Sequence, residues 1–67
     1  MTGTVLDLND FGSFWLLTIA AERRIVEQPI EPRHMRHLVE GEGLESPYDL
    51  EGREVQVSDD GMAIRLM

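Results

Sequence analysis

Polar and apolar residues alternate with a period of two along much of this chain, which is the pattern of half-buried β-strands. In the first stretch, Thr4, Leu6 and Leu8 alternate with Gly3, Val5 and Asp7. Residues typical of turns separate the stretches from one another. The sequence therefore predicts five strands, over residues 2–9, 13–20, 24–28, 53–58 and 62–66.

The stretch 13–20 is the strongest strand prediction, because it is rich in aromatic and β-branched residues. It is apolar on both faces, with Phe14, Leu16 and Thr18 on one and Trp15, Leu17 and Ile19 on the other. Such a strand should lie at the centre of a sheet, or carry a surface that something else covers. Pro29 cannot donate to a β-ladder, so it marks the end of the following strand or an edge position.

The segment that begins at Pro32 is the one convincing helix in the sequence. Proline is favoured at the first position of a helix. Met35 and Leu38 are three residues apart and share one helix face, which is then apolar. Gly41 and Gly43 are candidates for a left-handed cap at the other end. We expect the apolar stripe to lie on the sheet and to plug the open end of a barrel.

Three strands, a helix and two further strands follow one another in this order, which resembles OB-fold or SH3-like barrels in general. Ser46 and Asp49 have the spacing of a capping box, and they predict a single capped turn before the fourth strand. Asp59-Asp60-Gly61 predicts the turn of a terminal hairpin. The expected fold is mainly β with one short helix, a small five-stranded OB-like or SH3-like barrel that forms a single domain over residues 1–67.

Composition narrows the range of partners and cofactors. The chain has 13 acidic and 6 basic residues, and its net charge of −7 opposes binding to phosphate backbones and anionic membranes. It has no cysteine, so neither a disulfide nor a thiolate-bound metal supports the fold. The sequence shows no signal-peptide pattern and no apolar run long enough to span a bilayer. We therefore expect a cytoplasmic protein that does not bind membranes.

The predicted helix carries the one locally basic surface of the sequence. His34 and His37 stand three residues apart, and two imidazoles at this spacing could bind a transition metal with a third ligand. Arg33 and Arg36 interleave with them, and neighbouring cations disfavour a bound metal. We therefore predict no metal site and interpret these residues as a solvated helix face. Contact of Arg33 and Arg36 with an acidic partner is the second interpretation.

An acidic segment follows the helix. Its carboxylates are Glu40, Glu42, Glu45, Asp49, Glu51 and Glu54. Their order does not match a calcium-binding loop, and we interpret them as a solubilising surface. Mimicry of a nucleic acid toward a basic protein is a weaker hypothesis. The sequence also lacks a nucleophile elbow and a glycine-rich phosphate loop, which predicts a protein that is not an enzyme and has no cofactor.

The aromatic residues allow two interpretations. Phe11, Trp15 and Tyr48 have no obvious place in the core, whereas Phe14 is expected inside. On OB-like barrels, aromatic side chains of the central strands stack on nucleic-acid bases, next to a positive groove. Trp15 with Arg23 and Arg24 would form such a platform for single-stranded nucleic acid. Core or interface packing of Trp15 is favoured, because few cations are available for a groove.

The leading hypothesis from the sequence is a non-enzymatic interaction module that binds another protein or itself, as in a homodimer. The predicted partner-binding residues are Phe11, Phe14, Trp15, Arg33 and Arg36. The motivation is the strand that is apolar on both faces within a very small acidic domain. Single-stranded nucleic-acid binding through Trp15, Arg23 and Arg24 is the alternative.

Overall fold

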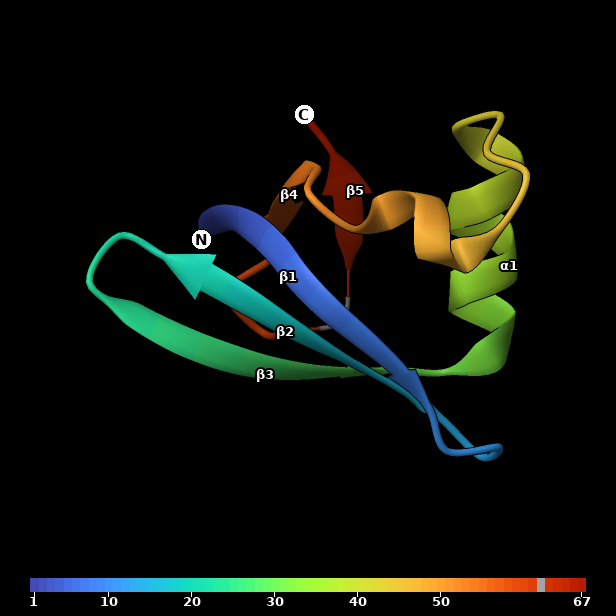
Figure 1. Ribbon diagram of the computed structural model, residues 1–67, viewed down its shortest axis with the longest axis horizontal. Coiled ribbons are helices and arrows are strands. Elements are labelled where there is room, and N and C mark those ends of the chain that lie inside the picture. Colours follow the sequence, from blue (N-terminus) through green and yellow to red (C-terminus); the bar gives the residue numbers. More distant parts are fainter. Residues whose placement is uncertain (62) are drawn as a thin grey trace.

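The computed structural model describes residues 1–61 and 63–67, and it has the predicted order of elements (Figure 1). All neighbouring strands are antiparallel and form one sheet in the order β3-β2-β1-β4-β5. A mainly β fold with one short helix is therefore confirmed. The elements are β1 (Thr2–Asp10), β2 (Trp15–Ala21), β3 (Arg24–Ile30), α1 (Pro32–Gly41), the 3-10 helix η1 (Pro47–Leu50), β4 (Glu54–Val57) and β5 (Ile64–Leu66).

Strand β1 departs from the simple alternation that its sequence suggests. Val5 and Leu8 are both buried, whereas Leu6 is 45% exposed. The pairing of β1 with β2 shifts between Val5 and Asp7, as in a β-bulge, so that Leu6 is an extra residue in the ladder. A bulge lets residues three apart face the same side. The grouping of Leu6 with Leu8 on one face is therefore wrong.

Strand β2 lies between β1 and β3 and is apolar on both faces, as expected. Leu17 and Ile19 are completely buried on the inner face. Leu16 and Thr18 point to the opposite face and are half-buried. The inner face of the sheet therefore carries the core, and the outer face of β2 is left without a covering layer among the described residues.

Helix α1 begins and ends with recognisable caps. Pro32 is its first residue, and Ile30 and Met35, on either side of the start, are both buried as in a hydrophobic staple. At the other end Gly43 has φ 70°, and the amide of Leu44 donates to the carbonyl oxygen of Val39 at 2.9 Å. These are features of a Schellman motif, for which glycine is the best residue. Gly41, the other predicted cap, lies inside the helix.

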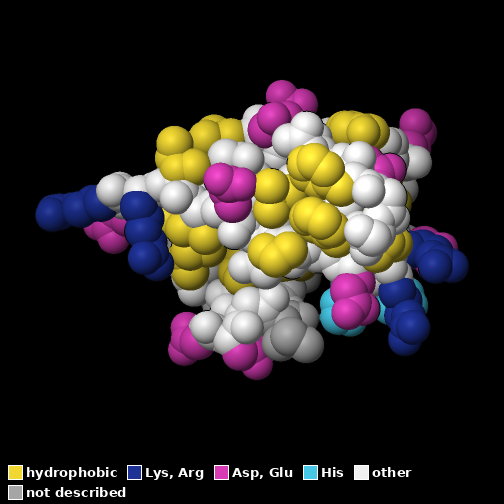
Figure 2. All heavy atoms as spheres, turned by 90° about the horizontal axis from the view of Figure 1, so that it is seen from below, with side chains coloured by type: hydrophobic (Ala, Val, Ile, Leu, Met, Phe, Trp, Pro, Cys, Tyr) yellow, Lys and Arg dark blue, Asp and Glu magenta, His cyan; other side chains and the backbone are white. Residues whose placement is uncertain are grey.

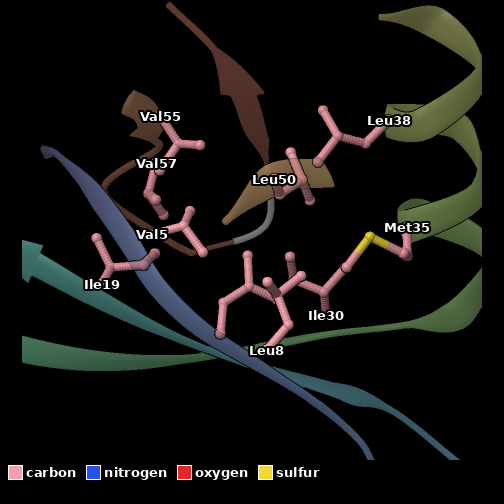
Figure 3. Close-up of a cluster of buried hydrophobic side chains, with 10 residues drawn as sticks. Val5, Leu8, Ile19, Ile30, Met35, Leu38, Leu50, Val55 and Val57 are labelled. Atoms are coloured by element: carbon pink, nitrogen blue, oxygen red, sulfur yellow. The ribbon is translucent and has the colours of Figure 1, made fainter. Parts of the chain in front are cut away.

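The core joins the helix to the inner face of the sheet. Met35 and Leu38 of α1 point toward Leu8, Ile30 and Leu50, so the helix covers one end of the sheet (Figure 3). The buried side chains are Val5, Leu8, Leu17, Ile19, Ile30, Met35, Leu38, Leu50, Val55 and Val57. No polar side chain is buried in the part of the chain that the structure describes. The fold is thus stabilised by one apolar cluster.

The two predicted turns near the C-terminus are confirmed. Ser46 caps η1 by accepting from the amide of Tyr48 at 3.2 Å, and Asp49 accepts from the amide of Ser46 at 3.1 Å. Strands β4 and β5 form a hairpin, and its turn includes Gly61. Met62, which the sequence places at the start of the last strand, lies outside the described residues.

The expected closure into a barrel is not found. Within residues 1–61 and 63–67, the sheet has two edges, β3 and β5, and no ladder joins them. Figure 1 shows β3 running beneath the β4–β5 hairpin, so the sheet is strongly curled. The side-chain amide of Gln28 donates to the carbonyl oxygen of Gly61 at 3.0 Å and connects the two sides of this gap. Pro29 lies on the edge strand β3, as predicted.

Candidate protein-binding surface

The β1–β2 turn places two aromatic rings against each other. The amide of Phe11 donates to the carbonyl oxygen of Phe14 at 3.0 Å and closes the hairpin one step beyond the pair of Asp10 and Trp15. Opposite residues in a ladder share a face, and successive pairs alternate between faces. Phe11 and Phe14 therefore lie on the side opposite Trp15, and their rings stack with centroids 5.1 Å apart. Phe14 is half-buried and belongs to the outer face, which corrects its expected place inside the core.

The stacked pair continues into a larger apolar surface, which we call the outer sheet face. Its members are Leu6, Phe11, Phe14, Leu16, Ile25 and Pro29. Phe11 is 58% exposed and Ile25 is 66% exposed. Figure 2 shows hydrophobic side chains gathered over the middle of the molecule on this side. Such exposure on neighbouring strands is more than the scattered apolar residues of an ordinary surface.

A row of polar side chains crosses the outer sheet face. Thr18 of β2 pairs with Asp7 of β1 on one side and with Glu27 of β3 on the other. Neighbouring strands are about 4.8 Å apart, so the backbones of Asp7 and Glu27 are about 10 Å apart. Asp7 accepts hydrogen bonds from the amide of Leu8 and the side chain of Asn9. Both carboxylate residues are exposed, and they divide the apolar surface into two parts.

Trp15 lies on the inner side of the sheet. Its ring is half-buried against the core and meets Tyr48 edge-on, with centroids 5.5 Å apart and planes at 70°. Tyr48 itself is 55% exposed. An indole held in this way has one part of its surface covered by the core and another by Tyr48. Trp15 is therefore separated from the Phe11–Phe14 pair by the sheet, and the structure does not unite the three predicted aromatic contact residues on one surface.

The arginines proposed for a nucleic-acid platform are far from Trp15. Trp15 is the first residue of β2, whereas Arg23 and Arg24 stand at the β2–β3 turn beyond the other end of that strand. Six residues of strand span roughly 20 Å. Arg23 and Arg24 are exposed at the tip of the hairpin. The three residues of the alternative hypothesis are thus not brought together.

The helix presents its basic residues to solvent, as expected. Arg33, His34, Arg36 and His37 are all exposed. A shallow hollow connects the start of α1 with the outer sheet face, and it is lined in part by Phe14, Pro29, Glu31 and His34. The predicted contact residues Arg33 and Arg36 are on the same helix as His34, but neither of them lines this hollow. Among residues 1–61 and 63–67, no group of His, Asp and Glu is arranged to hold a metal ion.

The acidic segment has a mainly structural organisation. Asp49 accepts hydrogen bonds from the amides of Glu45 and Ser46, and it therefore stabilises the start of η1. The other carboxylates of this segment are exposed. Glu42 lines a hollow with His34 and His37, and Glu54 lines another with Glu22.

Comparison with known proteins adds no relative: no protein family, no curated protein and no solved structure matches this chain. In the described part of the chain, no helix combines the length and the apolar character needed to cross a membrane. Leu6, Ile25 and Pro29 are not among the contact residues that the sequence predicts. Ile25 and Val26 are adjacent apolar residues of one strand, so the sequence implies that one of them faces away from the core, whereas it has no signal for the bulge that exposes Leu6.

Proposed function

We propose that this protein is a non-enzymatic interaction module that uses the outer sheet face to bind another protein or a second copy of itself. The observation that carries the proposal is the exposure of Leu6 on β1, Phe11 in the β1–β2 turn and Ile25 on β3, at 45%, 58% and 66%, on one face of the sheet. Exposed apolar side chains gathered on one face of a molecule are a common mark of a protein–protein contact. The exposed arginines of α1, Arg33 and Arg36, would contribute polar contacts at the rim of the interface.

The number of layers in the fold also supports this proposal. A sheet that is apolar on both faces normally has a layer on each face. Here the core and α1 cover the inner face, and the partner would supply the outer layer. We further propose that the fold is an open variant of an OB-like or SH3-like barrel, in which the bond between Gln28 and Gly61 replaces a ladder between β3 and β5. A cytoplasmic location remains a prediction from the sequence.

Site-directed photo-crosslinking tests the proposed function. A photoreactive phenylalanine analogue at Ile25 should form a discrete adduct in cells that produce the protein, because this side chain is 66% exposed at the proposed contact. The matched control carries the same analogue at Glu51, an exposed residue that follows η1. Equal adduct formation from the two positions would reject the outer sheet face as the binding surface.

A further inference from the structure

Strand β5 is an edge of the sheet, and its backbone groups alternate in direction. The carbonyl oxygen of Ala63 accepts from the amide of Ser58 at 2.8 Å, and the amide of Met67 donates to a carbonyl oxygen of β4 at 3.1 Å. In an antiparallel ladder, every second residue bonds to the same neighbouring strand. Ile64 and Leu66 therefore point their amide and carbonyl groups away from β4. In the part of the chain that the structure describes, no strand pairs with β5 on that side.

A hollow lies along this free edge, and helix α1 forms its other wall. We call it the β5 groove, and it is lined by His37, Leu38 and Glu42 on the helix side and by Ile64 and Arg65 on the strand side. In Figure 1, α1 and β5 both run from the bottom of the view toward the top. Leu38 is buried and Ile64 is half-buried against the core, so the groove has an apolar floor. None of the residues that define the outer sheet face lines it.

The other edge of the sheet, β3, is protected against a further strand. Pro29 has no amide hydrogen, and its carbonyl oxygen accepts from the side chain of Gln28 at 3.0 Å. Proline on an edge strand is one of the means by which proteins prevent additional pairing. Strand β5 contains no proline, so it is the edge that offers both donors and acceptors to a partner.

We propose that the β5 groove binds an extended segment of another protein, which adds a sixth, antiparallel strand to the five-stranded sheet. The backbone of this segment would exchange hydrogen bonds with Ile64 and Leu66, whose polar groups face the groove. An extended backbone presents donors and acceptors at the matching spacing, about 4.8 Å from its neighbour. We expect the antiparallel direction because all strand pairs of this sheet have it and because it is slightly more stable. This site is separate from the outer sheet face and would exist whether or not that face binds a partner.

The two faces of β5 determine which side chains the segment should carry. Ile64 and Leu66 pack against the core, whereas Arg65 is exposed on the other face. Residues directly opposite each other in a ladder share a face. The residues of the segment opposite Ile64 and Leu66 should therefore be apolar, and the residue between them should be polar.

Charge does not specify the segment further. The ionisable side chains that line the β5 groove are His34, His37, Glu42 and Arg65. They have no common sign, so neither an acidic nor a basic segment is favoured as a whole. Selection would depend on backbone hydrogen bonds and on the alternation of apolar and polar residues.

A second copy of the chain does not fit the β5 groove well. Two β5 strands related by a two-fold axis would pair antiparallel. The register that bonds Ile64 of each copy to Leu66 of the other places the two Arg65 side chains directly opposite each other. Like charges in this position destabilise a ladder. The net charge of −7 on each copy adds to the repulsion.

Two isomeric peptides test the proposal. Both are the same short peptide, in which valine alternates with threonine, and each carries a pair of N-methyl groups on its backbone. In one isomer the methyl groups are on the central valines, whose amides would face β5, and in the other they are on the neighbouring threonines. Each isomer is titrated into the isotope-labelled full chain, and NMR signals report the affinity and the site. The isomers have equal composition and hydrophobicity.

We expect the threonine-methylated isomer to shift the amide signals of Ile64 and Leu66. It should bind about tenfold more tightly than the valine-methylated isomer, because the latter lacks two backbone donors. Equal affinities, tighter binding of the valine-methylated isomer, or no binding of either at millimolar concentration would overturn the inference. Shifts confined to the outer sheet face would overturn it as well, yet they would support the proposed function.

A pair of variants separates the free amide from side-chain packing. Ile64→Pro removes an amide hydrogen that faces the groove, and Ile64→Ala keeps this hydrogen while it also shortens the side chain. Ile64 is the first residue of an edge strand, a position at which proline is tolerated. Ile64→Pro should bind the threonine-methylated isomer about fivefold more weakly than Ile64→Ala. Equal affinity of the two folded variants would contradict the proposed hydrogen bond, and if Ile64→Pro does not fold, the two isomers still decide.

Discussion

The side-chain amide of Gln28 lies 3.0 Å from the carbonyl oxygen of Gly61, although the two residues are 33 positions apart in the sequence. Gln28 belongs to the edge strand β3, and Gly61 belongs to the turn between β4 and β5. This hydrogen bond therefore crosses the open side of the curled sheet. Gln28 also donates to the carbonyl oxygen of Pro29 at 3.0 Å, which orients its amide group.

Replacement of Gln28 by alanine should loosen the connection between β3 and the terminal hairpin. We expect Gln28→Ala to lower the free energy of unfolding by about 1 kcal/mol, the usual value of one intramolecular hydrogen bond. Urea denaturation measures this change. Gln56→Ala is the matched control, because Gln56 is exposed on β4, and it should change stability by less than about 0.5 kcal/mol. Equal free energies of unfolding for Gln28→Ala and Gln56→Ala would show that the hydrogen bond to Gly61 does not stabilise the contact between β3 and the β4–β5 turn.

The bulge in β1 predicts opposite behaviour for two leucines that a simple alternation would pair. Leu8→Ala should lower the free energy of unfolding by about 2–5 kcal/mol, because Leu8 is buried in the core. Leu6→Ala should lower the free energy of unfolding by less than about 1 kcal/mol, because Leu6 is 45% exposed on the other face. Thermal and urea unfolding of both variants provide the comparison. Similar losses at the two positions would contradict the bulge.

Gly3 is required for the close approach of β1 to β2. A Cβ atom at this position would lie 2.6 Å from Cγ2 of Ile19 and 2.7 Å from the carbonyl oxygen of Ala20. Gly3→Ala should therefore destabilise the protein by about 1–3 kcal/mol. Gly41→Ala is the control, because Gly41 lies in α1 with open space around it. This variant should raise the free energy of unfolding by about 0.5–1 kcal/mol. A neutral Gly3→Ala variant, measured by urea denaturation, would contradict the tight packing of this strand pair.

The position of Trp15 leads to a prediction about nucleic acid. Its ring is covered in part by the core and by Tyr48, and the nearest predicted groove residues, Arg23 and Arg24, are at the opposite end of β2. Single-stranded DNA should therefore leave the tryptophan fluorescence unchanged even at low salt, where electrostatic binding is strongest. Quenching that saturates with oligonucleotide and weakens with salt would restore the nucleic-acid hypothesis.

Local signals in the sequence were sufficient for most elements of the fold. Pro32 marks the start of α1, and Ser46 with Asp49 marks η1, because each acts on neighbouring backbone groups. The closure of the sheet was not predictable in this way. It depends on how far the strands twist and on one long-range contact, that of Gln28 with Gly61, for which the sequence has no signal.

The candidate site was predictable only in part, for a related reason. Because β2 is apolar on both faces, its sequence predicts an apolar surface outside the core. Phe11 and Phe14 lie on that surface, the outer sheet face. Trp15 is also among the predicted contact residues, although the alternation along the strand already places it on the face opposite Phe14. Leu6 was missed because one extra residue in β1 reverses the direction of every side chain that follows it.

The most direct test of the outer sheet face as a binding surface is an NMR comparison of the isotope-labelled protein in buffer and in an extract of the cells that produce it. We predict selective loss of amide signals at Leu6, Phe11, Phe14, Leu16 and Ile25, while those of the exposed residues 51–54 persist. Uniform retention of all signals, or loss confined to residues 40–54, would contradict the account.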